Sequence, residues 1–306
     1  MNRREFLRDV FLFTAGFTAS VPMFDISNAG ATSNGGRPQL IEGTGTEYSR
    51  LMKVVTEGLG GMGKFVSPGD TVVIKPNIGW DRTVEQGANS HPLVVRALVE
   101  MALESGAQKV KVFDHTCNEK RRCYANSGIQ NALKQISDRR VRLEHIDRRK
   151  FVPVDIKKGK SLTRWDIYRD ALEADCYINV PVAKHHSLSR LTLGLKNSMG
   201  VIGGNRGSLH HDLGQKLADL ATVVRADLTV IDATRMLLRN GPQGGRVQDV
   251  KVADTIIATR DPVAADAYAT LLFGLQPDDI DSTVAAHRLG LGEIDPARIM
   301  IRKIQG

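Results

Sequence analysis

Cysteine is scarce in this sequence, and its three residues, Cys117, Cys123 and Cys176, restrict the metal and redox chemistry that the chain can hold. Three thiols cannot supply a four-thiolate cluster, and the spacing of Cys117 and Cys123 fits no common iron–sulfur or zinc pattern. We therefore expect no iron–sulfur cluster in this chain. Buried or loop thiols without a redox task are the favoured interpretation, and a Cys117–Cys123 disulfide in an exported protein is the alternative.

Several nucleotide and nucleic-acid signatures are also missing. There is no zinc-finger spacing and no RNP-type aromatic motif, and aromatic residues make up only 5% of the chain. No glycine-rich segment matches the Rossmann or P-loop pattern, and no serine lies in a nucleophile elbow. The net charge of +8 still predicts affinity for anions, and we expect a small anionic ligand rather than a nucleic acid. Apolar residues at 42% and charged residues at 25% are typical of a globular protein.

The first apolar run of the chain, residues 10–24, is short for a membrane span, which needs about 20 apolar residues. It follows Arg3-Arg4 and Phe6-Leu7, an arrangement that resembles a twin-arginine export signal. The resemblance implies recognition by the twin-arginine translocase and a periplasmic or otherwise extracytoplasmic location. An uncleaved amphipathic anchor is the alternative interpretation.

Small residues at Ala29 and Ala31 provide a candidate cleavage site. We accordingly divide the chain into a signal peptide at residues 1–31, a Gly/Ser/Thr-rich linker at 32–47, and a single α/β domain at 48–306.

Beyond the linker, short Val/Ile-rich runs alternate with helical patterns. A strand at 71–77, a helix at 92–107 that opens on proline, and a strand at 109–114 predict a parallel β–α–β unit. Further elements of both kinds are predicted at 176–181, 212–226, 228–233, 254–260, 262–274 and 298–303. The sequence therefore predicts an α/β fold with a largely parallel sheet flanked by helices. Residues 115–172 form a basic, less regular insertion in its middle.

Polar residues follow several of the predicted strands. Lys75 and Asn77 end the first strand, Lys184 follows the run at 176–181, and Asp232 closes the run at 228–233. Because the carboxyl ends of parallel strands meet at one edge of a sheet, we expect these side chains to line one pocket together with His186, Lys196 and His211.

Two chemistries are open for this pocket. A metal shell would combine His91, His186, His211 and Asp232, a mixed imidazole and carboxylate set that suits divalent metals; loop histidines in contact with solvent are the alternative. The concentration of lysines could instead hold a phosphate or carboxylate group. Gly203 and Gly204, in the glycine-rich segment 200–208 before a predicted helix, either supply amides to such an anion or only form a turn.

A series of blocks in order resembles the family called domain of unknown function 362. These blocks are VVIKPNIGW, HPLVVRALVEMALESGAQKVKVFD, INVPVAKHHSLSRLTLGLKNSMG, the histidine of SLHHDL, VIDATRMLLRNGPQGG and TRDPVAADAYA. The resemblance spans about residues 70–275. It implies that the family's recurrent polar positions fall on Lys75, Asn77, His91, Asp114, Lys184, His186, Lys196, Asn197, His211, Asp232 and Asp266. Many relatives carry a ferredoxin-like module with C-x-x-C-x-x-C runs, which this chain lacks, so a cluster is not inherited with the family.

Three functions compete on these grounds. The first is an exported, metal-associated enzyme acting on a small anion, with Lys184, His186, His211 and Asp232 as catalytic residues. Its substrate-binding residues would be Lys75, Asn77, Lys196, Asn197, Gly203 and Gly204. The second is a non-catalytic accessory protein that handles a metal or cofactor for a redox partner, and the third is an anion-binding protein.

Overall fold

A mixed β-sheet runs through the centre of the protein, for which a computed structural model describes residues 37–306. The order of its strands is β12-β1-β11-β10-β7-β2-β3-β4, and β8 and β9 extend it beside β10. The strands are β1 (Gln39–Thr44), β2 (Thr71–Pro76), β3 (Lys109–Val112), β4 (Val141–Leu143), β7 (Cys176–Val180), β8 (Val182–His186), β9 (Arg190–Thr192), β10 (Leu228–Leu237), β11 (Val250–Thr259) and β12 (Met300–Gln305). Within this sheet β11 and β9 run antiparallel to their neighbours, and the other pairs are parallel.

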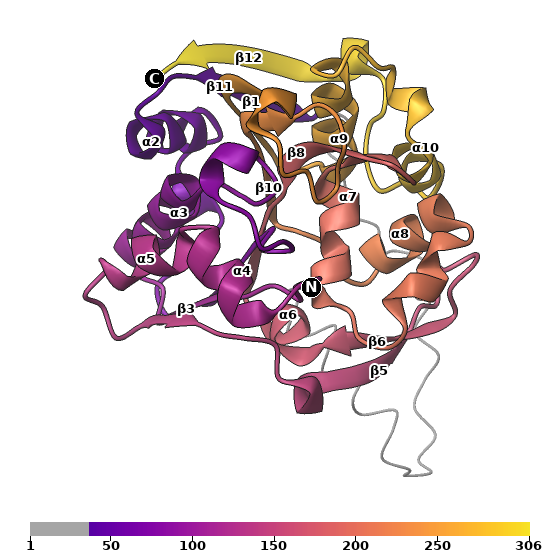
Figure 1. The fold of residues 1–306 in the computed structure, drawn as a ribbon, viewed down its shortest axis with the longest axis horizontal. Helices are drawn as coiled ribbons and strands as arrows, with labels where there is room; N and C mark the ends of the chain where they lie inside the picture. Colours follow the sequence, from indigo (N-terminus) through magenta and orange to yellow (C-terminus); the bar gives the residue numbers. More distant parts are fainter. Residues whose placement is uncertain (1–36) are drawn as a thin grey trace, which may run out of the picture.

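Helices cover both faces of the sheet (Figure 1). One group consists of α2 (Tyr48–Gly58), α3 (Pro92–Glu104), α4 (Lys120–Asn126) and α5 (Ile129–Lys134). The other consists of α7 (Gly194–Asn197), α8 (Leu213–Ala221), α9 (Pro262–Leu271) and α10 (Asp281–Arg288). The predicted α/β class, with a largely parallel sheet between helices, is therefore observed.

The alternation of side chains along the strands separates two apolar cores. In β2, Val72 and Ile74 join the core beneath α2 and α3, whereas Val73 joins the core on the opposite face. Neighbouring β7 repeats this pattern in register, with Ile74 opposite Ile178. Successive strand residues point to opposite faces, so the parity of a position decides which layer of helices it meets.

The parallel β–α–β unit forms as the sequence predicts. Helix α3 opens on Pro92, whose missing N–H costs nothing at a helix start, and the His91 ring accepts the N–H of Leu93. The chain then turns at Gly106, whose φ of +91° lies in the region that glycine tolerates best, and enters β3.

One prediction of organisation is wrong. Residues 39–44, assigned to a linker by composition, form β1, which lies between β11 and β12 with Leu40 and Ile41 fully buried. The predicted domain boundary at residue 48 is therefore too late. The strand predicted at 254–260 exists within β11, but it runs antiparallel to β10 because the connection between them is a hairpin rather than a helical crossover.

The basic middle of the chain has its own small sheet. Strands β5 (Phe151–Asp155) and β6 (Arg164–Tyr168) pair antiparallel and are followed by the short helix α6 (Arg169–Glu173). Figure 1 shows this hairpin at one end of the molecule, apart from the central sheet. The predicted leader at 1–31 lies outside the described residues, and none of the helices within 37–306 has the length and hydropathy of a membrane span.

Candidate functional site

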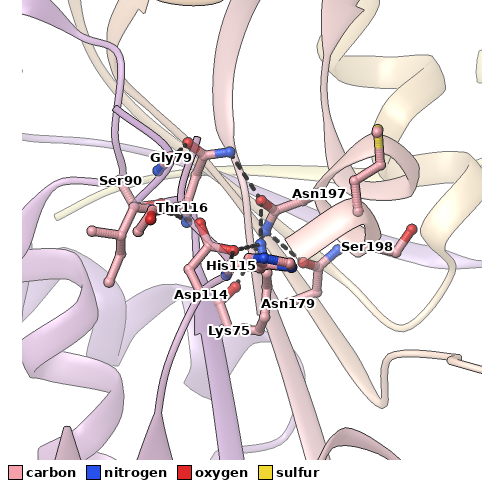
Figure 2. Close-up of polar contacts among 12 residues, drawn as sticks. Lys75, Gly79, Ser90, Asp114, His115, Thr116, Asn179, Asn197 and Ser198 are labelled. Atoms are coloured by element: carbon pink, nitrogen blue, oxygen red, sulfur yellow. Dashed lines mark hydrogen bonds and ion pairs between the residues drawn. The ribbon is translucent and has the colours of Figure 1, made fainter. Parts of the chain in front are cut away.

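An ion pair between Lys75 and Asp114 lies at the carboxyl ends of β2 and β3. The Lys75 ammonium is 2.8 Å from Oδ1 of Asp114, and the two side chains are only 1% and 3% exposed. Backbone amides of Ile78 and His115 also donate to this carboxylate. The pair packs closely against Gly200, because a Cβ there would lie 1.9 Å from the carboxylate oxygen. Figure 2 shows Lys75, Asp114 and His115 close together.

Asn197, at the end of α7, connects this ion pair to the neighbouring strands. Its amide oxygen accepts from the Lys75 ammonium at 2.8 Å and from the Asn77 amide at 3.1 Å. Its amide nitrogen donates to the Asn179 side chain and to the backbone oxygen of Lys75 (Figure 2). Each polar atom of the Asn197 side chain is thus used to hold β2 and β7 against α7.

The network continues to Lys184 in β8. The Lys184 ammonium donates to Oδ1 of Asn77 at 3.1 Å and to the backbone oxygen of Ala88 at 2.5 Å. Lys196 lies nearby on α7, and its one hydrogen bond in the described chain is to the sulfur of Met199 at 3.4 Å. Thioether sulfur is a weak acceptor, so the Lys196 ammonium has little compensation for its burial.

The environment disfavours positive charge on both of these lysines. Burial and, to a lesser extent, the charges of Lys196 and Lys75 together lower the pKa of Lys184 to about 7, against opposing contributions from Cys117 and Asp114. Burial likewise lowers the pKa of Lys196 to about 8. Within residues 37–306 neither ammonium has a carboxylate within 4.0 Å. An anion bound here would supply the missing countercharge.

His186 ends β8 beside these lysines. Its Nδ1 accepts the N–H groups of Leu188 and Ser189, so the neutral ring carries its proton on Nε2. Burial, followed by the charges of Lys196 and Lys184, lowers its pKa to about 3. His186 is consequently a neutral imidazole at physiological pH, and it also closes the turn between β8 and β9.

Asp266, on α9, holds the first turn of α7. Its two carboxylate oxygens accept the N–H of Gly194 at 2.7 Å and of Leu195 at 3.0 Å. Burial raises the pKa of this carboxyl to about 7, because the two backbone hydrogen bonds only partly offset the loss of water. Asp266 therefore positions the segment that carries Lys196 and Asn197 through backbone N–H groups at the start of that segment.

Asp232 makes its hydrogen bonds to residues outside the lysine and asparagine network. It lies two residues beyond Val230 in β10, on the sheet face covered by α2 and α3, and its Oδ2 accepts the backbone N–H of His91 at 2.5 Å. Its Oδ1 accepts the N–H and hydroxyl of Thr234. The parity of the strand positions places Asp232 and Lys75 on opposite faces of the sheet, whereas Lys184 lies two residues beyond Val182, the partner of Asp232 in the β8–β10 pair. Hydrogen bonds connect Lys184 with Lys75 through Asn77 and Asn197, and a pocket that also includes Asp232 stays a prediction.

The predicted metal shell is also not formed. His211 is exposed beyond the end of the turn at Arg206–His210, and the charge of its neighbour His210 contributes to the lowered pKa of His186. His91 lies with Asp232 at the start of α3. No three His, Cys, Asp or Glu side chains in the part of the chain that the structure describes are grouped to hold a metal ion.

The glycines predicted to cradle an anion serve the β5–β6 hairpin instead. Gly203 donates its N–H to the backbone oxygen of Asp166, and its own oxygen accepts the indole N–H of Trp165. Gly204, with a φ of +64°, completes the turn beside the same ring. Because the Gly203 amide already has a partner, this segment is a packing turn rather than an anion cradle.

Sequence reasoning missed two contributors to the site. Asn179 lies within an otherwise apolar strand, so its position alone gave no indication of a site. In the structure it pairs with Lys75 in the parallel β2–β7 pair, which places both side chains on one face of the sheet. Arg206 lies in the glycine-rich segment, from which its guanidinium reaches the backbone oxygens of His115 and Thr116. Its charge lowers the pKa of Lys196, so it adds to the positive potential of the site.

The structure contains no disulfide between Cys117 and Cys123. Cys117 is exposed and Cys123 is buried. A cavity of about 290 Å³ lies elsewhere, beside α5 and β4, where Tyr124, Leu133 and His145 help line it. That cavity contains none of the lysines described above.

Three of the blocks, at residues 72–80, 91–114 and 178–200, carry the side chains that form the Lys75 network. A family model for DUF362, described as a domain of unknown function, matches residues 72–270. The chain belongs to this family. The match begins at β2 and ends in α9, so it includes the complete lysine and asparagine network.

One relative is the thylakoid-associated protein sll1697 of a Synechocystis strain, which is 27% identical over 255 residues, covering 78% of this chain and 74% of that protein. Two solved structures also align. One is a Thermotoga maritima protein from structural genomics, with a TM-score of 0.43, 11% identity, and coverage of 74% of this chain and 59% of that one. The other is the lactate racemase apoprotein of Thermoanaerobacterium thermosaccharolyticum, with a TM-score of 0.44, 12% identity, and coverage of 78% and 56%. The chain therefore aligns with little more than half of either solved protein.

Proposed function

We propose that this member of the DUF362 family binds a small carboxylate- or phosphate-bearing substrate at the lysine site and acts on it as an enzyme. The observation that supports this proposal most strongly is that Lys184 and Lys196 are only 1% and 8% exposed and have no carboxylate partner within residues 37–306. Burying uncompensated ammonium groups costs several kcal/mol, and a bound anion would offset that cost. The arrangement favours binding and proton transfer over a purely structural role.

The two lysines have different tasks in this proposal. Lys196, the more exposed of the two, is the first ammonium that an anion entering from solvent meets. Lys184 changes protonation near neutral pH, which suits a group that exchanges a proton with the substrate. The Nε2–H of His186 is available as a neutral hydrogen-bond donor beside them.

Isothermal titration calorimetry with inorganic phosphate and with pyruvate tests this proposal. We expect saturable binding that weakens as the pH rises through about 7 to 8, because Lys184 and Lys196 then lose the protons that attract the anion. The Lys196→Gln variant should bind roughly tenfold or more weakly, since a charge-assisted hydrogen bond is lost. Lys134→Gln, at an exposed position on α5, is the matched control. Absence of binding for both probes up to about 10 mM, above the usual range of substrate affinities, would contradict the proposal.

We also propose that the protein is exported by the twin-arginine translocase and acts outside the cytoplasm. Arg3-Arg4 before Phe6-Leu7 motivates this proposal. Replacing both arginines with lysine should leave the protein in the cytoplasmic fraction, with loss of the processed form, as judged by fractionation and N-terminal sequencing. Undiminished export of the Arg3→Lys, Arg4→Lys variant would refute the route. The thylakoid association in the name of the cyanobacterial relative is compatible with a site of action at or beyond a membrane.

A further inference from the structure

The Lys184 amine stands out among the polar groups because it is buried beside other cations. It is among the largest side chains that the fold buries completely, and it has no carboxylate partner in the described chain. Its two acceptors are a neutral side-chain amide and a backbone carbonyl, which leave one ammonium N–H without an assigned partner. Lys75, in contrast, is neutralised by direct contact with Asp114.

A lysine that is desolvated next to other positive charges is chemically distinct from an ordinary surface lysine. Its amine is more readily deprotonated, and a deprotonated amine is a nucleophile toward carbonyl carbon. For Lys184 burial is the largest influence, and the charges of Lys196 and Lys75 act in the same direction. The hydrogen bonds to Asn77 and Ala88 fix the direction of the amine at the carboxyl edge of the sheet.

Resting on the anion site proposed above, we infer that Lys184 forms an imine with a small substrate that carries both a carbonyl and an anionic group, such as a 2-oxo acid. Lys196 would hold the anionic group, and the neutral His186 ring would donate its Nε2–H toward the carbonyl oxygen. The nitrogen lone pair of Lys184 attacks the carbonyl carbon and a C–N bond forms. Both amine hydrogens leave with the carbonyl oxygen as water, so the C=O bond becomes C=N without oxidation or reduction.

Reductive trapping tests this inference on the full mature chain. Incubation with pyruvate and sodium cyanoborohydride should add one reduced pyruvate to the intact mass, and peptide mapping should place it on Lys184. The trapping rate should be highest between about pH 7 and 8, where Lys184 has lost its proton and Lys196 still retains its own. Lys184→Arg should abolish the adduct, and Lys196→Gln should slow its formation roughly tenfold.

Two controls make the outcomes distinct. Exposed Lys157 and Lys158 report the background reactivity of ordinary lysines in the same peptide maps. If calorimetry shows that pyruvate binds but Lys184 is labelled no faster than these two lysines, the imine is refuted and the anion site stands. If pyruvate and phosphate both fail to bind and no adduct forms, the anion site is refuted with it.

Discussion

Replacing Asp114 with asparagine is expected to lower the free energy of unfolding by about 3–5 kcal/mol, the usual cost of removing one partner of a buried ion pair. The Lys75 ammonium would lose its charged partner at 2.8 Å while remaining buried. The asparagine amide would also turn a donor toward groups that now donate to Asp114, among them the N–H of Ile78. Urea unfolding at pH 7, followed by circular dichroism, measures the change.

The matched control is Asp138→Asn, which breaks the more exposed ion pair with Arg140 at 2.7 Å. Surface pairs contribute about 0–1 kcal/mol, so this variant should be nearly as stable as the parent protein. Lys75→Met and the Lys75→Met, Asp114→Asn double variant complete a cycle, and the double variant should be destabilised by less than the sum of the single changes. Equal, small effects of Asp114→Asn and Asp138→Asn would show that the Lys75–Asp114 pair does not stabilise this edge.

Asp266→Asn is expected to separate stability from ligand binding. The pKa of Asp266 is raised to about 7 in the folded protein from its ordinary value of 3.8, so the folded state binds more protons between those values. The free energy of unfolding therefore falls as the pH rises from about 4 to 7, by on the order of a few kcal/mol. The asparagine variant lacks this contribution, and at pH 8 it should be at least as stable as the parent protein.

The same variant should bind phosphate more weakly. Asparagine has one acceptor oxygen where the carboxylate has two, so Gly194 or Leu195 would lose its partner and the start of α7 would shift. A loss of roughly tenfold in affinity is expected, in line with one unmade buried hydrogen bond. Asp261→Asn is the control, because this residue caps α9 through Val263 and Ala264 rather than α7. An Asp266→Asn variant with lower stability at pH 8 and unchanged affinity would contradict the positioning role.

The sequence was sufficient to predict that Lys75, Asn77 and Lys184 lie close together. Lys75 and Asn77 end a recognisable Val/Ile strand, and the parallel β–α–β unit directs strand ends to one edge, where Lys184 contacts Asn77. The assembly of these residues follows from topology, which short apolar runs and helix punctuation reveal. Their role in binding substrate stays a prediction.

The face on which Asp232 lies, strand β1 and the role of Gly203 could not be predicted from the sequence, because they depend on contacts between segments that are distant in the chain. The run that ends at Asp232 is apolar at consecutive positions because β10 is buried on both faces, so no alternation indicates which face Asp232 meets. Strand β1 was overlooked because its neighbours in sequence are rich in Gly, Ser and Thr, and its stability comes from pairing with distant β11 and β12. The role of Gly203 was likewise decided by its contacts with a hairpin whose position the sequence did not predict.

The most direct test of the anion site is a crystal structure of the mature protein soaked with selenate, whose selenium gives an anomalous signal. The account predicts an anomalous peak within hydrogen-bonding reach, about 3–4 Å, of the Lys196 ammonium, accompanied by its loss in Lys196→Gln. Selenate found only on exposed side chains such as Lys157 and Lys158, with the same distribution in the variant, would contradict the claim that the buried lysines form an anion-binding site.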